Sequence, residues 1–288
     1  MHGIRFSLIM ATYGREAEVS AYLESVTTQE IPSTLFEVIL VDQNDRIDLG
    51  PIIERFRDKL NVVHVKLSEK GASLARNAGL RIARGDLVAF PDDDCEYYPD
   101  TLARVLQCSL ANPDVDIFHG KIIDRKLGKD VMRPWPNESR TIDIHNSYYF
   151  GSAIALFVKQ YEGMHFDPQL GPGKRFGGYE DVEFVMRNVR AGRQAMYWPE
   201  IHVLHPELNR HVMSESKAFS YGLGFGAICR KHISIPVLYL FSKSIGFHLF
   251  HTAKALVSFN WRGLRTGIVA ITSRIVGFFS YSSADTIR

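Results

Sequence analysis

Three consecutive aspartates, Asp92, Asp93 and Asp94, form an acidic run that is followed closely by Glu96. Neighbouring carboxylates repel one another unless a positive charge lies among them. Aspartates at alternate positions can supply two oxygen ligands to a divalent cation, or one ligand and one contact to a ribose. The run therefore predicts a site for a hard cation such as Mg²⁺ or Mn²⁺. The alternative is a solvated acidic turn or a helix N-cap.

The elements around this run predict a sheet whose strands end in polar residues. Continuous apolar segments predict strands at 4–11, 36–41 and 86–90, an alternating segment predicts one at 61–67, and helical spacing covers 16–29 and 72–83. Such strands, separated by helices, are typical of a largely parallel sheet covered on both faces. Ligands of these sheets bind beyond the carboxyl ends of the strands. Thr12, Asp42 and Asp92 follow three of the strands, so we expect a site at that edge.

The middle of the chain is less regular. We expect strands at 117–123 and 151–159, loops at 133–137 and 166–178, and a helix at 179–191. Glu180 and Asp181 open this helix, where carboxylates suit the positive end of the helix dipole. A charge pair at a helix N-terminus is therefore one interpretation of these two residues.

Charge is distributed unevenly along the 288 residues. The segment from Arg210 to the C-terminus has ten Lys or Arg and two Asp or Glu, a net charge of +8, so the first 209 residues carry −6 of the total +2. A basic, aromatic-rich tail on an acidic body predicts contact with an anionic partner. With 45% hydrophobic residues, the chain can form one large domain plus an appendage.

The cysteines and the N-terminus predict a cytoplasmic protein. Three cysteines, Cys95, Cys108 and Cys229, give an odd count without CxxC spacing, which favours neither a disulfide framework nor a zinc site. Reduced thiols are typical of the cytoplasm. The first apolar run is only about five residues long, too short for a signal-peptide core.

Several motifs together resemble family 2 glycosyltransferases with the GT-A fold. The nucleotide-sugar half of that family resembles Phe6–Arg15 (FSLIMATYGR), Glu37–Asp45 (EVILVDQND) and Lys70–Pro99, in which the DDD run matches the DxD motif. The acceptor half resembles Phe166–Gly171 (FDPQLG), Gly178–Arg187 (GYEDVEFVMR), Tyr197–Pro206 (YWPEIHVLHP) and Tyr221–Lys231 (YGLGFGAICRK). The resemblance covers roughly residues 4–231. It implies an α/β protein with a Rossmann-like, mixed and mostly parallel sheet, helices on both faces and C-terminal amphipathic helices.

The resemblance also implies which residues bind the donor. Three sets of contacts are expected: Thr12, Tyr13 and Arg15 around the base and ribose, Asp42 accepting from the base, and Lys70, Arg76 and Asn77 near the diphosphate or ordering its loop. A solvated helix residue is the alternative for Arg76.

The same resemblance assigns the metal and the base. Asp94 would be the direct ligand of Mg²⁺ or Mn²⁺, Asp92 would contact the ribose or the metal through water, and Asp93 would line the nucleotide-sugar site with a less defined role. His205 would be a third metal or pyrophosphate contact, with His202 as its rival and packing within a strand as the alternative. Asp181 would be the general base and Glu180 would position the acceptor. Two separated acidic clusters suit a single inverting displacement, in which a metal stabilises the leaving diphosphate and a carboxylate accepts the hydroxyl proton.

The sequence predicts two domains. Residues 1–231 would form the glycosyltransferase domain, with a nucleotide-sugar half at about 1–110 and an acceptor half at about 111–231, and residues 232–288 a basic helical tail. Helices at 236–259 and 261–281 are expected, the first with a polar stripe of Ser244, His248, His251, Lys254 and Ser258. Basic amphipathic helices bind anionic lipid. We therefore expect peripheral attachment to the inner face of the cell membrane. The alternatives are packing on the body, a homodimer contact or a spanning hairpin.

The predicted function is a metal-dependent, inverting hexosyl- or deoxyhexosyltransferase. Its donor would be a UDP- or dTDP-linked sugar and its acceptor a saccharide or lipid-linked hydroxyl, in cell-surface polysaccharide or glycolipid synthesis. A sugar-nucleotide pyrophosphorylase would need a glycine-rich basic loop after the first strand, and a dinucleotide oxidoreductase would need GxGxxG there; the sequence has ATYGR. A non-catalytic scaffold of the same fold is a further alternative. The acidic body disfavours a nucleic-acid partner.

Overall fold

The chain divides into two units, and neither is continuous in sequence. The computed structural model describes residues 3–206 and 214–282. Unit 1 comprises 1–143, 152–166 and 188–209, and unit 2 comprises 144–151, 167–187 and 210–288. Arg210 and Arg288, which contribute to the basic charge of the tail, lie outside the described residues. The division of the sequence at 231/232 stays a prediction.

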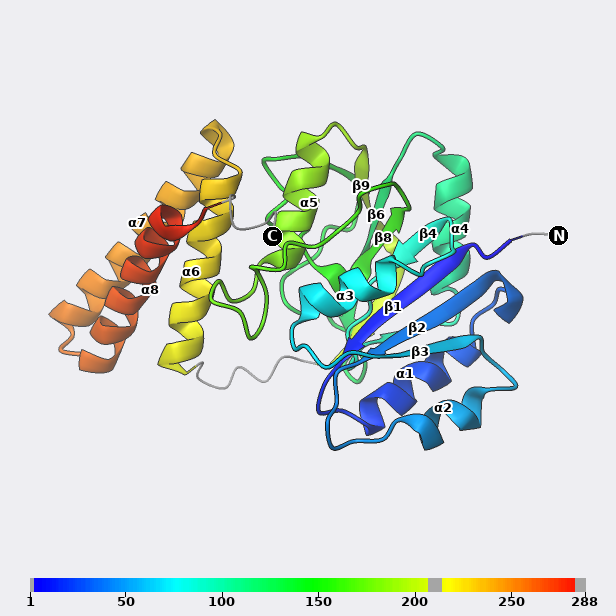
Figure 1. Cartoon of the computed structure of the whole chain (residues 1–288). Coiled ribbons are helices and arrows are strands. Elements are labelled where there is room, and N and C mark those ends of the chain that lie inside the picture. The colour runs from blue at the N-terminus through cyan, green and yellow to red at the C-terminus, as the bar shows by residue number, and fades with distance from the viewer. Residues whose placement is uncertain (1–2, 207–213, 283–288) are drawn as a thin grey trace. The chain divides into compact units, whose positions relative to one another are not determined.

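A mixed sheet forms the centre of unit 1. Its described strands follow the order β3-β2-β1-β4-β8-β6-β9-β5, with β7 paired to β9 (Figure 1). The strands are β1 Phe6–Thr12, β2 Phe36–Asp42, β3 Val62–Lys66, β4 Leu87–Ala89, β5 Glu96–Tyr97, β6 Ile117–Asp124, β7 Arg140–Ile142, β8 Leu156–Lys159 and β9 Ala195–His205. The longer ladders, β1–β2, β2–β3 and β6–β9, are parallel, while β8 runs antiparallel to β4 and β6.

The burial of the strands explains their composition. Every residue of β2 is buried, and in β1 all but one are. Successive side chains of a strand point to opposite faces, so both faces of this part of the sheet are covered. The helices of this unit are α1 Ala17–Thr27, α2 Gly50–Phe56, α3 Ala72–Leu80 and α4 Thr101–Ala111. Helix α3 packs on β1 and β2, and α4 packs on β6 and β9.

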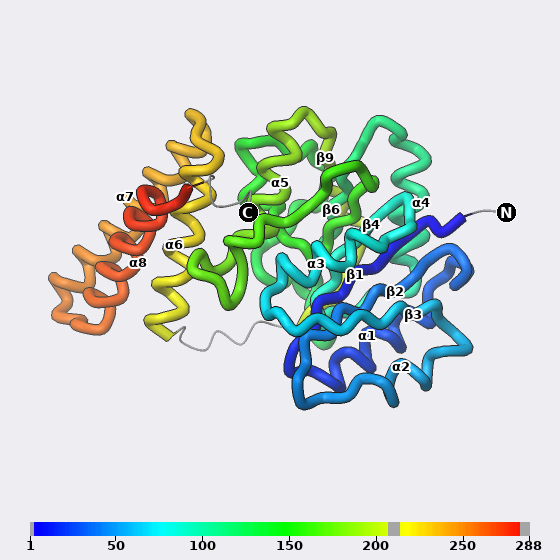
Figure 2. Tube along the Cα trace, viewed as in Figure 1, coloured from blue at the N-terminus to red at the C-terminus, as the bar shows by residue number. Residues whose placement is uncertain are grey.

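Unit 2 is helical. Its helices are α6 Glu215–Lys231, α7 Ile235–Val257 and α8 Trp261–Ser280, and α5 Glu180–Arg190 begins in it. Helix α8 lies against both α6 and α7 (Figure 2). Gly222 and Gly226 of α6 face Ser273 and Gly277 of α8 so closely that a Cβ on Gly226 would lie 2.1 Å from the Arg274 carbonyl oxygen. Small residues four apart allow helix backbones to approach in this way. The apolar side of α6 also packs on Val182 and other residues of α5.

The main expected elements are present, with three differences. The strand expected at 151–159 begins only at Leu156, because Ala153–Ala155 form a 3₁₀ turn. No helix was expected at α2, α4 or α6, and the second half of α6 was noted only as the motif Tyr221–Lys231. Within 3–206 and 214–282, none of the helices combines the length and apolar character that a membrane span requires.

Candidate functional site

The predicted donor residues meet where three strands of unit 1 end. Parallel pairing of β1 and β2 sets Thr12 directly opposite Asp42. An isolated parallel bridge between Ala11 and Asp92 places the chain beyond β4 on the other side of β1. The sheet thus brings the start of the acidic run beside the end of β1, at the edge where ligands of such sheets bind.

Arg15 and Thr12 hold two of the three aspartates. The Arg15 guanidinium bridges Asp93 Oδ1, at 3.2 Å from Nε, and Asp94 Oδ2, at 2.9 Å from Nη2. The Thr12 hydroxyl donates to Asp93 Oδ2 at 2.9 Å. Burial raises the pKa of Asp93 to about 6, against the hydrogen bond from Thr12 and the charge of Arg15. Burial would also raise the pKa of Asp94, but the hydrogen bond and charge of His205, together with Arg15, lower it overall. Asp94 is therefore the more strongly ionised of the pair.

His205, the last residue of β9, lies beside Asp94. Its Nε2 is 3.4 Å from Asp94 Oδ1, and its Nδ1 is 2.6 Å from the Pro206 carbonyl oxygen. His202 instead lies against the ring of Tyr98, with ring centroids 5.5 Å apart. Of the two rival histidines, His205 is the one that the structure brings to the acidic run.

Arg76 and Asn77 of α3 have different roles. Arg76 Nη2 pairs with Asp92 Oδ1 at 2.9 Å, and its guanidinium carbon lies 5.2 Å from the centre of the Phe166 ring. Asn77 forms two hydrogen bonds with the backbone of Phe166, donating to its carbonyl at 2.8 Å and accepting from its N–H at 2.7 Å. Both polar ends of the Asn77 amide are therefore engaged by the backbone of the loop at Phe166.

Asp42 lies in a pocket of donors from its own loop and from β3. It accepts from the Asn44 backbone and side chain at 2.8 and 2.9 Å, from His64 Nε2 at 2.9 Å and from Lys66 Nζ at 2.8 Å. Burial raises the pKa of Asp42, but hydrogen bonds from Lys66, Asn44 and His64 outweigh it, so the pKa is lowered. His64 and Lys66 were missed from the sequence, where their only signal was the alternation of β3.

Lys70 and Tyr13 lie together beyond the same strand ends. Lys70 Nζ donates to the Gln43 carbonyl oxygen, pairs with Asp45 Oδ1 at 2.7 Å and lies 4.8 Å from the centre of the Tyr13 ring. The Tyr13 side chain is exposed. An exposed aromatic ring at this edge offers a surface on which a planar base can stack.

The acidic run fits a cation whose ligands come partly from a substrate. Among the described residues, no three His, Cys, Asp or Glu side chains form a metal-ligand group. Asp94 and His205, however, supply one carboxylate and one imidazole donor next to each other. Mg²⁺ commonly binds through one or two carboxylates plus phosphate oxygens and water. Mn²⁺ also prefers oxygen ligands, and imidazole is a common metal ligand in proteins. Two protein donors are thus sufficient for a divalent ion that arrives with a diphosphate.

In unit 2, an unusual turn positions Glu180 and Asp181. Gly178 and Tyr179 both have positive φ, 70° and 66°, directly before α5. A non-glycine residue in this conformation stores strain and is found preferentially at functional sites. Glu180 is buried, and Asp181 Oδ1 accepts from the Val182 N–H at 2.8 Å. Glu180 and Asp181, the two carboxylates predicted to act on the acceptor, therefore begin α5 directly after a turn of defined conformation.

A buried ionic cluster in unit 2 was missed from the sequence. Lys231 Nζ lies 2.6 Å from Asp167 Oδ2 and 2.9 Å from Glu183 Oε1. Asp167 Oδ2 also accepts from the Tyr281 hydroxyl at 2.7 Å, and Glu183 Oε1 lies 3.2 Å from His232 Nε2. Asp167 and Glu183 belong to the two motifs FDPQLG and GYEDVEFVMR, but their partners come from distant parts of the sequence. The cluster joins the loop before α5, the helix itself and the ends of α6 and α8.

Comparison with known proteins identifies the family to which the sequence is similar. The profile described as "Glycosyl transferase family 2" matches residues 7–167, more than half of the chain. An uncharacterized glycosyltransferase of Haemophilus influenzae is 37% identical over 114 residues, which is 39% of this chain and 37% of that protein. The poly(ribitol-phosphate) beta-N-acetylglucosaminyltransferase TarS of Staphylococcus aureus is 35% identical over 101 residues, 34% of this chain and 18% of TarS. These matches span less than half of each relative.

Solved structures support the fold. S. aureus TarS 1-349 in complex with UDP-GlcNAc aligns with a TM-score of 0.63 and 16% identity, covering 97% of this chain and 93% of that one. The mannosyltransferase PcManGT of Pyrobaculum calidifontis, in complex with GDP-Man and Mn²⁺, aligns with a TM-score of 0.63 and 16% identity, covering 97% and 88%. The predicted α/β fold with C-terminal helices is confirmed.

Proposed function

Because the chain belongs to glycosyl transferase family 2, we propose that it moves a sugar from a nucleotide-diphosphate donor to a hydroxyl group in a metal-dependent, inverting reaction. The pairing of Asp94 with His205, beside Arg15 at the carboxyl end of the sheet, is the observation that carries this proposal. A carboxylate, an imidazole and a guanidinium lie together there, and sheets of this kind bind their ligands at that edge, which supports a donor site.

The donor is a UDP- or dTDP-linked hexose or deoxyhexose. The exposed Tyr13 ring offers the surface for the base, beside the strand ends at Thr12 and Asp42, whose own side chains are buried. Arg15 and Arg76 supply positive charge toward the diphosphate. In the structure they pair with the three aspartates of the acidic run. The complex of TarS with UDP-GlcNAc supports a uridine nucleotide as the first candidate.

Asp94 and His205 would hold a Mg²⁺ or Mn²⁺ ion, and Asp92 would contribute to its surroundings. When bound, the ion stabilises the negative charge that develops on the leaving diphosphate. Asp94 suits this role because the Arg15 guanidinium lies 2.9 Å from its carboxylate and favours the ionised form. The PcManGT complex with GDP-Man and Mn²⁺ supports the use of a divalent ion.

Asp181 accepts the proton of the acceptor hydroxyl, and Glu180 orients that acceptor. The hydroxyl oxygen forms a bond to the anomeric carbon while the bond from that carbon to the diphosphate oxygen breaks, and the proton passes to Asp181. A single displacement of this kind inverts the anomeric configuration. The fixed turn at Gly178 and Tyr179 supports the assignment, because a general base must be held in position.

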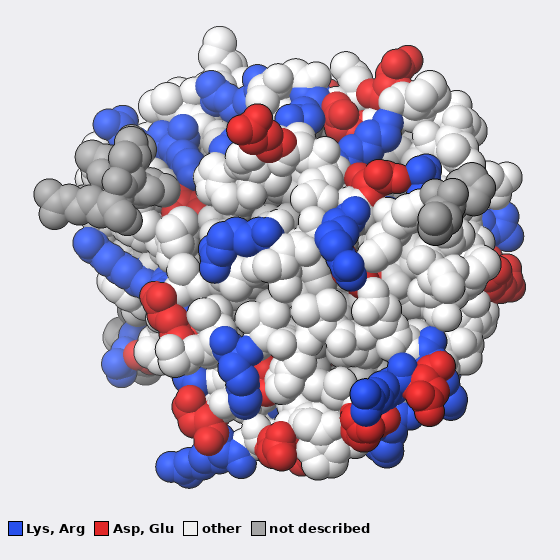
Figure 3. All heavy atoms as spheres, turned by 45° about the vertical axis from the view of Figure 1, so that its right-hand side comes forward, with Lys and Arg blue, Asp and Glu red and all other residues white. Residues whose placement is uncertain are grey.

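The acceptor is a saccharide or a lipid-linked hydroxyl used in cell-surface polysaccharide or glycolipid synthesis. The helices α7 and α8 attach the enzyme to the inner face of the cell membrane, on the cytoplasmic side. Their cationic sequence and exposed apolar side chains support membrane attachment over a homodimer contact. Acidic and basic side chains are interspersed on the face of the molecule shown in Figure 3.

A donor screen tests the proposal. Thermal shift is measured with a panel of UDP- and dTDP-sugars, with and without Mn²⁺, on wild type, Asp94→Ala and the control Asp58→Ala, whose side chain is exposed. We expect at least one donor to stabilise wild type and the control only with Mn²⁺, and Asp94→Ala to lose that shift. Asp181→Asn is expected to keep the shift but to lose roughly 10²–10⁴-fold in transfer rate. A panel without any metal-dependent shift contradicts the proposal, and loss of donor binding in Asp181→Asn would make that residue structural.

A further inference from the structure

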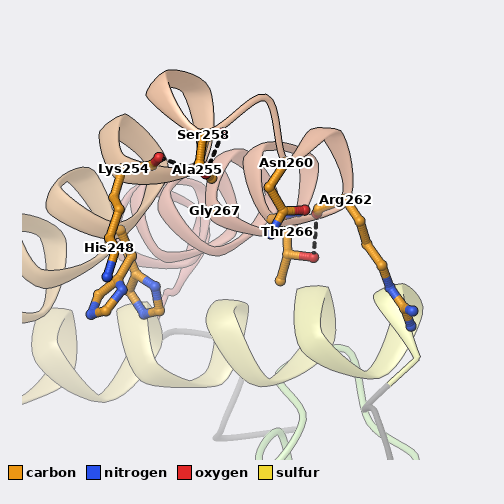
Figure 4. A pocket seen from close by; sticks show the side chains of 10 residues that line it. His248, Lys254, Ala255, Ser258, Asn260, Arg262, Thr266 and Gly267 are labelled. Carbon is orange, nitrogen blue, oxygen red and sulfur yellow. Dashed lines mark hydrogen bonds between the residues drawn. The ribbon is translucent and has the colours of Figure 1, made fainter.

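A cavity of about 500 Å³ opens at the turn between α7 and α8 (Figure 4). Its polar lining comes from His248, His251 and Lys254 on α7 and from Asn260, Arg262 and Thr266 at the start of α8. In Figure 4 the side chains of His248 and Lys254 lie on one side of the cavity and Arg262 on the other. Four of the five residues of the polar stripe expected on the first tail helix, all but Ser244, therefore line a cavity.

Among the described residues that line the cavity, none is Asp or Glu. Residues 216–282 contain no Asp or Glu. Among the described residues, neither Lys254 nor Arg262 has a carboxylate within 4 Å, whereas Arg265 on the same helix pairs with Glu215 at 2.8 Å. Asn260 caps α8 by accepting from the Gly263 N–H, so the positive end of this long helix also lies at the cavity. Two cationic side chains and a helix terminus without a counter-charge are the chemistry of a phosphate site.

The turn between α7 and α8 also exposes apolar side chains, which we call its rim. Val257, Phe259 and Trp261, at the turn between the two helices, have 79%, 78% and 68% of their surface exposed. Phe259 has a positive φ of 53°, so the turn is held in a conformation that costs energy for a non-glycine residue. Tryptophan is enriched at membrane interfaces, where an apolar ring can be buried while its N–H stays hydrated.

The cationic cavity and the exposed apolar rim together favour one class of partner. A soluble phosphate accounts for the cavity but leaves the exposed apolar rim unexplained. A second copy of the chain could cover the rim, but in a symmetric contact between two such turns it would bring another α7–α8 pair without acidic residues toward Lys254 and Arg262. An anionic phospholipid supplies both a phosphate and an apolar layer, in the arrangement that the cavity and its rim require.

We propose that the α7–α8 turn inserts into the headgroup region of an anionic membrane and that the cavity binds the phosphate of one phospholipid. Lys254 and Arg262 donate to the phosphate oxygens, Thr266 offers a hydroxyl, and Phe259 and Trp261 enter the boundary between headgroups and acyl chains. This inference rests on the proposed membrane attachment of the tail and is independent of the sugar-transfer reaction.

Vesicle co-sedimentation of the full chain tests the site. Wild type is compared on phosphatidylcholine vesicles with and without phosphatidylglycerol, together with the cavity variant Lys254→Gln/Arg262→Gln. The matched control, Lys243→Gln/Arg265→Gln, removes the same charge from exposed positions on the same two helices. We expect binding only with phosphatidylglycerol, roughly 30-fold weaker binding for the cavity variant, and less than about fivefold weaker binding for the control. Equal losses in both variants would show diffuse electrostatic attraction and overturn the phosphate site.

Further arms distinguish the other sources of the same chemistry. The rim variant Phe259→Ser/Trp261→Ser is expected to lose vesicle binding while its circular dichroism stays that of wild type. If wild type is stabilised by glycerol 3-phosphate through Lys254 and Arg262 but does not bind vesicles, a soluble anion is the ligand and the proposal is wrong. A dimer in sedimentation velocity that the rim variant abolishes would identify a second copy as the partner. The Mn²⁺-dependent donor shift must persist in the cavity variant, so failure here is distinguishable from failure of the transferase proposal.

Discussion

The buried ionic cluster in unit 2 predicts that Lys231→Met strongly destabilises the protein. Lys231 Nζ lies within 2.9 Å of one oxygen of Asp167 and one of Glu183, and both acidic residues are 0% exposed. Methionine keeps the length and apolar character of the lysine stem but removes its charge. The substitution therefore leaves two buried carboxylates that have lost their shared cation, with little change in packing.

The expected magnitude follows from the partners that remain. Removing one partner of a buried ion pair costs about 3–5 kcal/mol, because the other charge stays buried without compensation. Glu183 keeps Arg187, at 3.0 Å, and His232, while Asp167 keeps the Tyr281 hydroxyl. These contacts reduce the penalty, so we expect a loss of about 3 kcal/mol in the free energy of unfolding.

Urea unfolding followed by circular dichroism measures this loss. The control Lys243→Met removes an exposed lysine of α7 and should change the free energy of unfolding by less than about 0.5 kcal/mol. Adding Asp167→Asn to Lys231→Met removes one of the two uncompensated charges, so the double variant should lose less than the sum of the single variants, by roughly 0.5–3 kcal/mol. A loss below about 1 kcal/mol for Lys231→Met, or strict additivity, would refute the reasoning.

Two further predictions concern the same unit. Gly226→Ala should lower the free energy of unfolding by about 1–3 kcal/mol, because its Cβ would lie 2.1 Å from the Arg274 carbonyl oxygen; thermal unfolding measures this loss. Gly246→Ala, in an open position of α7, should instead stabilise by up to about 1 kcal/mol, and equal effects of the two substitutions would contradict the close packing of α6 and α8. Burial raises the pKa of Glu183, but the His232 hydrogen bond and the charges of Arg187 and Lys231 outweigh it and hold the pKa well below its usual range. The ionised Glu183 therefore stabilises the fold above its pKa in the unfolded chain, roughly 4.3, and this stabilisation is lost as the pH falls below that value. The urea midpoint should fall more steeply between pH 6 and 2 for wild type than for Lys231→Met. If the urea midpoints of the two proteins fell in parallel with pH, Glu183 would not be the source of the acid sensitivity.

The strand ends could be predicted because they depend on local pattern. Continuous apolar runs mark β1, β2 and β4, and the polar residue that ends each run belongs to the binding edge of a parallel sheet. The contacts among those residues could not be predicted in the same way. Arg15 reaches two aspartates more than 75 positions away, and Lys66 reaches Asp42 only because β3 pairs with β2 in a particular register.

The tail shows the same distinction between pattern and packing. Helical spacing correctly placed His248, His251 and Lys254 on one face of α7. What that face meets is decided by α8, whose position depends on Gly226 and Gly277 packing backbone to backbone, and a single sequence does not mark a glycine as a helix contact. The helices α4 and α6 were not predicted, for a related reason: their stability comes from the surfaces that they cover.

The proposed donor residues and the proposed base belong to different units, which gives the functional variants an internal control. Thr12, Arg15 and Asp94 belong to unit 1, whereas Glu180 and Asp181 belong to unit 2. Unit 2 also contains the Lys231 cluster, which secures the helix that begins with those two residues. Lys231→Met should therefore reduce sugar transfer more than donor binding, because the donor contacts lie in the other unit. A variant that loses both to the same extent has lost the fold of the whole chain, and its activity says nothing about the base.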